Sequence, residues 1–349
     1  MIKAEAKMLY LNRAQVEQIC QEIDTVGAMR DVFRLHGLKQ TILPEEAHLS
    51  WTNELGEPVR SLNMPGYLGG TLHVAGTKII NGNIRNPERG LPRASGLTML
   101  CDDTTGQVMC IMEAAYISSL RTASVTALAV ELFQGPPVSC MALIGAGALA
   151  QAHIALLVKT VPQLQRILVH DLNHERIKML RKDVADLLDR YHITLQETLT
   201  AEEAIRPAQL IVPVTTVTAG YIRFEWLAPG SILVNISLDD PLPEVVLRAT
   251  IVVVDDWELV RSDPRRLLGR MYREGRLLGP DERGEVLTPD CRRVDMQLGD
   301  LVAGGQTGRR SPEDIILVNP FGLSLEDLVL ATHVYQKALE QNVGGWLEH

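Results

Sequence analysis

Residues 140–150 read CMALIGAGALA, and this stretch decides the fold of the chain. An apolar run over residues 140–144 meets a turn containing Gly145 and Gly147, and an apolar helical pattern follows. The stretch matches G-x-G-x-x-G/A, in which a strand, a tight turn and a helix N-terminus seat the pyrophosphate of a dinucleotide. Gly145 would allow the sharp turn, Gly147 would let the backbone approach the phosphates, and Ala150 would let the helix pack on the strand. The sequence therefore predicts a dinucleotide site here.

An acid at the end of the next strand indicates which dinucleotide binds. Residues 167–171 read ILVHD, so Asp171 follows a buried-type strand. A carboxylate there accepts hydrogen bonds from the adenosine ribose and repels a 2′-phosphate, which favours NAD over NADP. The alternative is a surface acid that caps the next helix. Polar residues at later strand ends add candidate cofactor contacts, although such residues are common there: Thr216, Thr218 and Ser237.

Composition excludes several classes of function. The chain has 349 residues, a net charge of −9 and 46% hydrophobic residues, as in ordinary globular proteins. An acidic chain without a dense basic block is a poor partner for nucleic acid or an anionic membrane, and the short basic cluster at 263–266 is expected to be a solvated helix face. The five cysteines are scattered without a C-x-x-C pair, so neither a disulfide framework nor a zinc site is expected. With no secretory signal or membrane-spanning run, we expect a cytoplasmic protein.

After residue 138 the pattern alternates between strands and helices, which predicts an α/β fold with a parallel, doubly wound sheet. Expected strands are residues 140–144, 166–170, 210–214, 231–236, 251–254 and 315–319. Expected helices are residues 148–159, 174–191, 202–205, 244–248 and 264–274.

The earlier part of the chain has a different pattern. A strand at residues 8–11 leads into one helix that is capped by Asn12 and continues to about Val26. Short alternating runs broken by Gly, Pro and Asn then predict an antiparallel sheet with strands at 59–64, 72–80, 94–101 and 107–112. A helix over 113–133 ends at Gly-Pro-Pro. The last helix is expected to be capped by Ser324 with Asp327 three residues later.

Three cations before residue 125 are candidate substrate ligands. Lys78 lies inside an apolar strand, where the pattern alone favours a side chain that points to solvent. Arg121 lies in a small, apolar helical stretch that suits a partly buried arginine held for a carboxylate, with a structural ion pair as the alternative. For Arg60, the sequence does not favour a substrate ligand over a surface residue. Asp240 follows a strand end, where it would shuttle a proton or cap the next helix.

Taken together, these segments resemble the ornithine cyclodeaminase/mu-crystallin family over essentially the whole chain. No single element is specific, but their order and spacing are. The matching elements are Gly76-Thr77-Lys78, Ser119-Leu120-Arg121-Thr122-Ala123, Gly145-Ala146-Gly147, Thr216-Val217-Thr218, Asn235 through Asp240, and Phe321-Gly322 before Glu326-Asp327.

Within the family the chain is most similar to the branch that forms 2,3-diaminopropionate for siderophores or antibiotics. Supporting stretches include residues 8–13, 93–96, 112–114, 117–119, 252–257 and 314–320. Ornithine cyclodeaminases carry a longer loop with a lysine where this chain has Leu238-Asp239-Asp240-Pro241-Leu242-Pro243-Glu244. This departure speaks against cyclisation of ornithine.

The resemblance implies an NAD-dependent oxidoreductase that acts on N-(2-amino-2-carboxyethyl)-L-glutamate. A hydride leaves the glutamate Cα, and water then cleaves the imine to give 2-oxoglutarate and L-2,3-diaminopropionate. Arg60, Lys78 and Arg121 would bind carboxylates of this amino-acid-derived substrate, and Asp240 would move the proton, with Asp239 as a competitor. Lys78 would also orient water. The further cofactor contacts implied are Ala148, Leu149, Leu238 and Gly322.

The resemblance also implies two domains and a homodimer. Residues 1–130 and 320–349 would form an α+β substrate-binding and dimerisation domain, and residues 131–319 a Rossmann-type NAD-binding domain. The alternatives are a cyclodeaminase or another amino-acid or imine dehydrogenase of this family, and a mu-crystallin-like protein that binds a small ligand without turnover.

Overall fold

The computed structural model describes residues 7–237, 239–283, 290–304 and 308–348. The chain forms two compact units: the first comprises Met1–Arg121 and Leu323–His349, and the second comprises Thr122–Gly322. Both chain ends therefore belong to the first unit. One boundary falls inside helix α3 (Ala115–Leu132), and the other falls just before helix α11 (Ser324–Gln341). In the described part of the chain, no helix is both long and apolar enough to cross a membrane.

The first unit is built on one mixed sheet in the strand order β18-β1-β7-β6-β5-β4-β2, with β3 paired to β4. Its strands are β1 (Lys7–Leu11), β2 (Thr41–Ile42), β3 (Ala47–Thr52), β4 (Pro58–Leu68), β5 (Val74–Asn83), β6 (Ala94–Asp102), β7 (Val108–Glu113) and β18 (Gly345–Glu348). Its other helices are α1 (Arg13–Cys20), α2 (Thr25–Gly37) and the 3-10 helix η1 (Asn86–Arg89).

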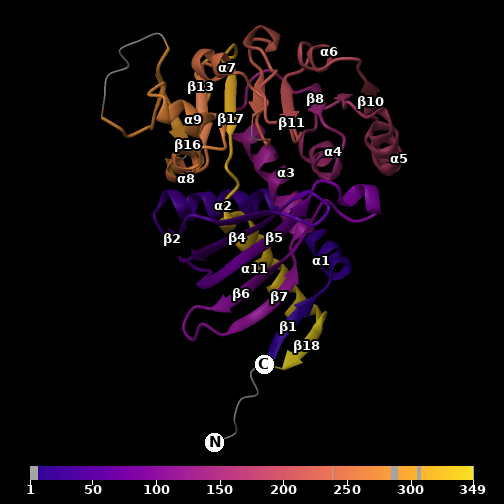
Figure 1. The fold of residues 1–349 in the computed structure, drawn as a ribbon, viewed down its shortest axis with the longest axis vertical. Coiled ribbons are helices and arrows are strands. Elements are labelled where there is room, and N and C mark those ends of the chain that lie inside the picture. Colours follow the sequence, from indigo (N-terminus) through magenta and orange to yellow (C-terminus); the bar gives the residue numbers. More distant parts are fainter. Residues whose placement is uncertain (1–6, 238, 284–289, 305–307, 349) are drawn as a thin grey trace, which may run out of the picture. The chain divides into compact units, whose positions relative to one another are not determined.

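The antiparallel strands β4 to β7 were predicted within a few residues of their ends, and the prediction is confirmed for them. The sheet as a whole is mixed, because β1 runs parallel to β7. The chain returns to this sheet at its C-terminal end, where β18 pairs with β1. Helix α11 packs on β4, β5 and β6 and against α1 and α2 (Figure 1). One face of the sheet is therefore buried beneath a helix that comes from the far end of the sequence.

Two predictions about helices of the first unit are wrong. The single N-terminal helix is divided into α1 and α2, because Asp24 accepts the Gly27 N–H and starts a new helix. Asn12 does cap α1, in a capping box with Gln15. Helix α11 begins at Ser324 with Leu323 as its N-cap residue, and Glu326 accepts the Leu323 N–H. The Ser324 hydroxyl instead donates to the carbonyl oxygen of Pro65.

The second unit contains a parallel sheet in the order β10-β9-β8-β11-β12-β17-β13-β16. Its strands are β8 (Cys140–Ile144), β9 (Arg166–His170), β10 (Thr194–Glu197), β11 (Leu210–Pro213), β12 (Ile232–Val234), β13 (Ile251–Val254), β16 (Met296–Gln297) and β17 (Ile316–Asn319). A small separate sheet pairs β14 (Leu277–Leu278) with β15 (Arg292–Arg293).

Helices connect these parallel strands. They are α4 (Ala148–Thr160), α5 (His174–Tyr191), α6 (Ala201–Ile205), α7 (Pro243–Arg248), α8 (Trp257–Ser262), α9 (Leu267–Arg273) and α10 (Leu298–Gly304), with the 3-10 helix η2 (Phe224–Trp226). Every residue of β8, β11, β13 and β17 is buried, as expected for parallel strands covered on both faces. The predicted doubly wound α/β fold is confirmed. The helix predicted over 264–274 is shorter, and α8 precedes it.

Candidate functional site

The glycine turn after β8 has the geometry that its sequence predicts. Gly145 has φ +104°, and its N–H donates to the His170 carbonyl oxygen at 2.8 Å. A side chain there would place Cβ 3.0 Å from the Val214 carbonyl oxygen. Glycine is therefore required both by the backbone conformation and by the close approach of β11. The turn therefore follows β8 and contacts the ends of its two neighbours, β9 and β11.

Helix α4 begins directly behind this turn with Gly147 as its N-cap. No side chain caps it, and a Cβ built on Gly147 would meet nothing within 4 Å. The first N–H groups of a helix, here from Ala148 and Leu149 onward, have no acceptor within the helix. Ala150 is fully buried, which lets α4 lie close to the sheet. Open space in front of uncapped N–H groups fits a phosphate.

Asp171 holds the end of β9 against the glycine turn. Its Oδ2 accepts the Ala146 N–H at 2.8 Å, and its Oδ1 accepts the Asn173 N–H at 2.8 Å. The alternative that Asp171 caps the next helix is wrong, because Asn173 is the N-cap residue of α5. The carboxylate therefore sits beside the turn, where the sequence placed it, and its role toward a ribose stays a prediction.

Side chains from the loops after β11 and β12 form a hydrogen-bonded network around Asp240. The Thr215 N–H donates to Ser237 Oγ at 2.7 Å, which joins the two loops. Thr215 Oγ1 and the Tyr221 hydroxyl both donate to Asp240 Oδ1, at 2.7 and 2.9 Å. The predicted contacts Thr216 and Thr218 lie beside this network as exposed side chains. Leu238 lies outside the described residues.

Asp240 is 0% exposed, and burial raises the pKa of its carboxyl group. Hydrogen bonds from the Thr215 and Tyr221 hydroxyls oppose this increase, because they favour the ionised form, and the nearby Ser237 hydroxyl acts in the same direction. Its side chain does not cap the next helix, since α7 has Leu242 as its N-cap residue. A buried carboxylate with a raised pKa and neutral partners is a candidate for proton transfer.

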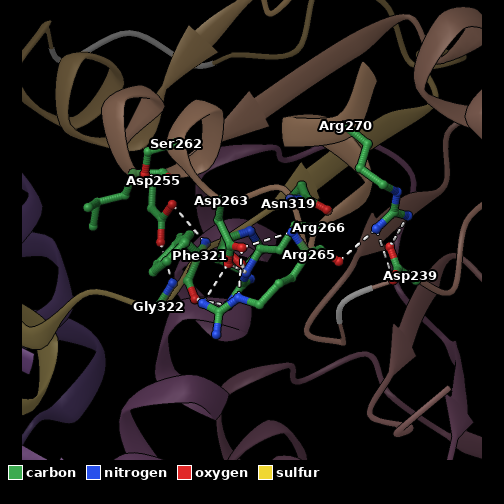
Figure 2. A network of polar contacts seen from close by, with 12 residues as sticks. Asp239, Asp255, Ser262, Asp263, Arg265, Arg266, Arg270, Asn319, Phe321 and Gly322 are labelled. Atoms are coloured by element: carbon green, nitrogen blue, oxygen red, sulfur yellow. Dashed lines mark hydrogen bonds and ion pairs between the residues drawn. The ribbon is translucent and has the colours of Figure 1, made fainter. Parts of the chain in front are cut away.

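The neighbouring Asp239 is held differently. Arg270 from α9 donates to both of its oxygens, at 2.5 and 3.3 Å (Figure 2). This ion pair keeps the Asp239 carboxylate engaged by a permanent cation. The two adjacent acids, which the sequence does not distinguish, thus have distinct surroundings.

A second network holds the segment between β17 and α11. Asp255 is buried, and its carboxylate accepts the N–H groups of Phe321 and Gly322 at 2.8 and 2.7 Å (Figure 2). Arg266 donates to the carbonyl oxygens of Pro320 and Phe321 and lies over the Phe321 ring. The expectation of a solvated helix face for this basic cluster is therefore wrong for Arg266. The Gly322 N–H is already donated to Asp255, and its role toward a cofactor stays a prediction.

In the first unit, Lys78 is 1% exposed, so the expectation that it faces solvent is wrong. Its ammonium group donates to Asp327 Oδ2 at 2.6 Å and to Ser118 Oγ at 3.3 Å. Burial lowers the pKa of Lys78, and the Asp327 carboxylate opposes that decrease. The strand face that carries Lys78 is the face covered by α11, and this is why a lysine in an apolar strand is buried here.

Arg121 joins the same cluster. Its Nη1 donates to Glu326 Oε2 at 2.6 Å, and its Nε lies 3.5 Å from Asp327 Oδ2. The structural ion pair considered from the sequence is therefore present. Lys78, Arg121, Glu326 and Asp327 balance two positive with two negative side chains. The Arg121 side chain is 11% exposed, so it reaches the surface of the cluster while Lys78 does not.

Arg60 lies away from this cluster. Met64 pairs with Lys78, and Arg60 lies four residues earlier on β4, roughly 13 Å away along the strand. It lines a cavity of about 260 Å³ together with His48, Ser50 and Arg93. Of the three cations predicted to bind substrate, the structure therefore brings together Lys78 and Arg121.

Comparison with known proteins identifies the family. Residues 56–342 match the profile of the Ornithine cyclodeaminase/mu-crystallin family. The chain belongs to this family. The family resemblance read from the sequence is thereby confirmed.

Among the similar family members is N-((2S)-2-amino-2-carboxyethyl)-L-glutamate dehydrogenase of Staphylococcus aureus (strain NCTC 8325 / PS 47). It is 29% identical over 347 residues, which cover 97% of each chain. The crystal structure of CmnK is similar with a TM-score of 0.88 and 33% identity, covering 98% of both chains. An archaeal alanine dehydrogenase dimer with bound NAD has a TM-score of 0.81 and 24% identity, covering 98% of this chain and 99% of the other, and this likeness shows the fold.

Four residues that contact Asp240, Lys78 or Arg121 were not among the predicted site residues: Thr215, Tyr221, Glu326 and Asp327. The pair Glu326-Asp327 did carry a signal, because two adjacent acids directly precede the apolar run LVLA in the sequence, and all six residues are buried in α11. The sequence interpretation assigned Asp327 to a helix cap instead. Tyr221 carried no local signal, since its contact depends on how two loops meet.

Proposed function

We propose that the chain is an NAD-dependent dehydrogenase that oxidatively hydrolyses N-(2-amino-2-carboxyethyl)-L-glutamate to L-2,3-diaminopropionate and 2-oxoglutarate. The observation that carries this proposal is the buried carboxylate of Asp240 on a sheet whose first turn fits a pyrophosphate. The substrate assignment is supported by the similarity to the staphylococcal dehydrogenase over nearly the full length of both chains. The product, an amino acid with two amines, suits a siderophore or antibiotic pathway.

The second unit supplies the cofactor residues. Bound NAD would accept a hydride from the substrate carbon next to the nitrogen. Gly145 and Gly147 leave room for the pyrophosphate at the start of α4, where Ala148 and Leu149 present N–H groups. Asp171 disfavours a 2′-phosphate by charge repulsion, which selects NAD over NADP.

Asp240 is the residue we assign to proton transfer. Loss of hydride from an amine is easier after the nitrogen has lost a proton, and an ionised carboxylate accepts that proton. Asp239 is the weaker candidate because Arg270 already holds both of its oxygens. The reaction therefore needs Asp240 ionised when the substrate binds.

Arg121 and Lys78 are assigned to the substrate carboxylates. Arg121, whose side chain is 11% exposed, suits direct carboxylate binding, and the buried Lys78 lies behind it in the same cluster. Glu326 and Asp327 already neutralise both cations. The fixed positions of the two cations, more than a net positive charge, would therefore select the substrate carboxylates. Arg60 lies roughly 13 Å from Lys78 along the sheet, so its role toward a third carboxylate of the substrate stays a prediction.

A homodimer through the first unit is part of the proposal. The sheet face opposite Lys78 carries exposed Leu49 and Trp51 on β3 and exposed Leu97 on β6. An exposed apolar sheet face of this kind is typical of a protein interface. Sedimentation equilibrium of the purified chain, with a monomer mass as the contradicting result, tests the dimer.

The test of the activity is NADH formation by the purified chain with NAD+ and the secondary amine. We expect NADH, 2-oxoglutarate and 2,3-diaminopropionate in equal amounts, and a fall of turnover by about 10²-fold or more in Asp240→Asn with NAD binding retained. Proline formed from ornithine would indicate a cyclodeaminase instead. Ligand binding without any NADH would indicate a non-catalytic binding protein.

A further inference from the structure

The loops after β11 and β12 are joined by their backbones next to Asp240. The N–H groups of Tyr221 and Ile222 both donate to the Asp240 carbonyl oxygen at 2.9 Å, and the Leu242 N–H donates to the Ile222 carbonyl oxygen at 3.0 Å. Gly220 permits this approach, since a Cβ there would lie 2.8 Å from the Pro241 carbonyl oxygen. Tyr221 is therefore placed beside Asp240 by main-chain contacts.

The consequence is an asymmetric carboxylate. Both side-chain donors, Thr215 Oγ1 and the Tyr221 hydroxyl, bind the same oxygen, Oδ1. The other oxygen, Oδ2, is buried and has no hydrogen-bond partner among the residues that the structure describes. An orphaned acceptor in a buried site is costly unless something uses it. Asp240 thus has one oxygen fixed and one oxygen left for another group.

We propose that Thr215 and Tyr221 are positioning residues that hold Oδ1 of Asp240, and that Oδ2 is the atom that exchanges the proton. This inference rests on the role proposed above for Asp240. Two donors on one oxygen fix the rotation of the carboxyl group and draw negative charge to Oδ1, while the lone pairs of Oδ2 stay available.

The surrounding charges are consistent with this division of roles. Burial and the Asp240 carboxylate raise the pKa of Tyr221 far above neutrality, so its hydroxyl stays a neutral donor. Among the residues of the second unit that the structure describes, the titratable groups beside Asp240 are Tyr221 from the β11 loop and Asp239, which is paired with Arg270 of α9. Substitution of Tyr221 or Thr215 therefore changes hydrogen bonding to Asp240 without removing a charge.

The experiment is a titration of the ligand-free chain labelled with ¹³C at the aspartate carboxyl carbons. The Asp240 resonance is assigned by its loss in Asp240→Asn. Tyr221→Phe and Thr215→Val each remove one donor to the ionised form, so each should raise the titration midpoint by about one pH unit. Thr215→Ser keeps the hydroxyl and should restore the wild-type midpoint. Tyr272→Phe, a change at a part-buried tyrosine stacked on Trp257, is the matched control and should leave the midpoint unchanged.

Midpoints that stay unchanged in both Tyr221→Phe and Thr215→Val overturn the inference. The Thr215→Val and Thr215→Ser pair decides alone if Tyr221→Phe does not fold. Because no substrate or cofactor is present, the expected shift supports the positioning role even if the chain forms no NADH, so failure of the proposed function is seen separately. In an active enzyme, the acidic limb of the pH profile of kcat/KM should move to higher pH with the same variants.

Discussion

Asp327 in the first unit and Asp240 in the second unit are both fully buried, and their partners differ in kind. Asp327 faces the ammonium of Lys78 and the guanidinium of Arg121, whereas Asp240 faces the hydroxyls of Thr215 and Tyr221. A carboxylate between two cations is held in place by both of them, and removing its charge would leave the cations uncompensated. Protonation of a carboxylate that is held by neutral hydroxyls costs less free energy, because no cation loses its counter-charge. The first arrangement fixes geometry, and the second permits proton transfer.

The largest expected effect comes from removing the charge of Asp327. Asp327→Asn leaves the buried ammonium of Lys78 without its main partner, and we expect the free energy of unfolding to fall by about 3 kcal/mol. Urea denaturation, with hydrogen exchange of α11 as a local readout, measures it. The double variant Lys78→Met, Asp327→Leu removes both charges and should recover most of the loss. A single-variant loss below about 1 kcal/mol would contradict the role of the pair.

The same Asp→Asn change at position 240 should alter how the stability of the folded chain depends on pH. Burial raises the folded-state pKa of Asp240 above its unfolded value, so the folded state holds an extra proton between the two. Wild-type stability is therefore lost as pH rises through the folded pKa, whereas Asp240→Asn cannot titrate. We expect the free energy of unfolding of Asp240→Asn, relative to wild type, to increase as the pH rises above about 4. A difference that is constant over this range contradicts the assigned environment.

The smallest effect is expected at the adjacent Asp239. Its partner Arg270 is 40% exposed, so water can replace the lost ion pair in Asp239→Asn. We expect a loss of about 1 kcal/mol in the free energy of unfolding, with most of the turnover retained. Urea denaturation and steady-state kinetics measure both quantities. If Asp239→Asn abolished turnover while Asp240→Asn did not, the two acids would exchange their assigned roles.

The elements of the second unit were predictable because they are local. The strands β8, β9 and β13 and the helix α5 were predicted to the residue, since unbroken apolar runs or a 3.6-residue period end at clear turn signals. In contrast, β3 was missed because each of its residues is exposed, and it exists through its pairing with β4. The C-terminal β18 was also missed, because its residues are exposed and its partner β1 lies at the opposite end of the chain.

The candidate site was predictable to different degrees. Gly145, Gly147 and Asp171 were found because a turn and the strand ends beside it impose local rules. The burial of Lys78 was not predicted, because the alternation of residues along a strand does not tell which face of the sheet a distant helix will cover. The acid that neutralises Lys78 lies 249 residues later in the sequence. Tyr221 was not found because its hydroxyl reaches Asp240 through a contact between two irregular loops.

By itself, the sequence determined the glycine turn, the parallel fold around it and the family to which the chain belongs. These depend on short-range backbone requirements: a positive φ at Gly145, an uncapped helix start at Gly147, and strands apolar on both faces. Only the tertiary structure decided which ionisable groups are buried and with whom. That outcome depends on desolvation and on pairing between distant segments, which placed Lys78 against Asp327 and left Asp240 among hydroxyls.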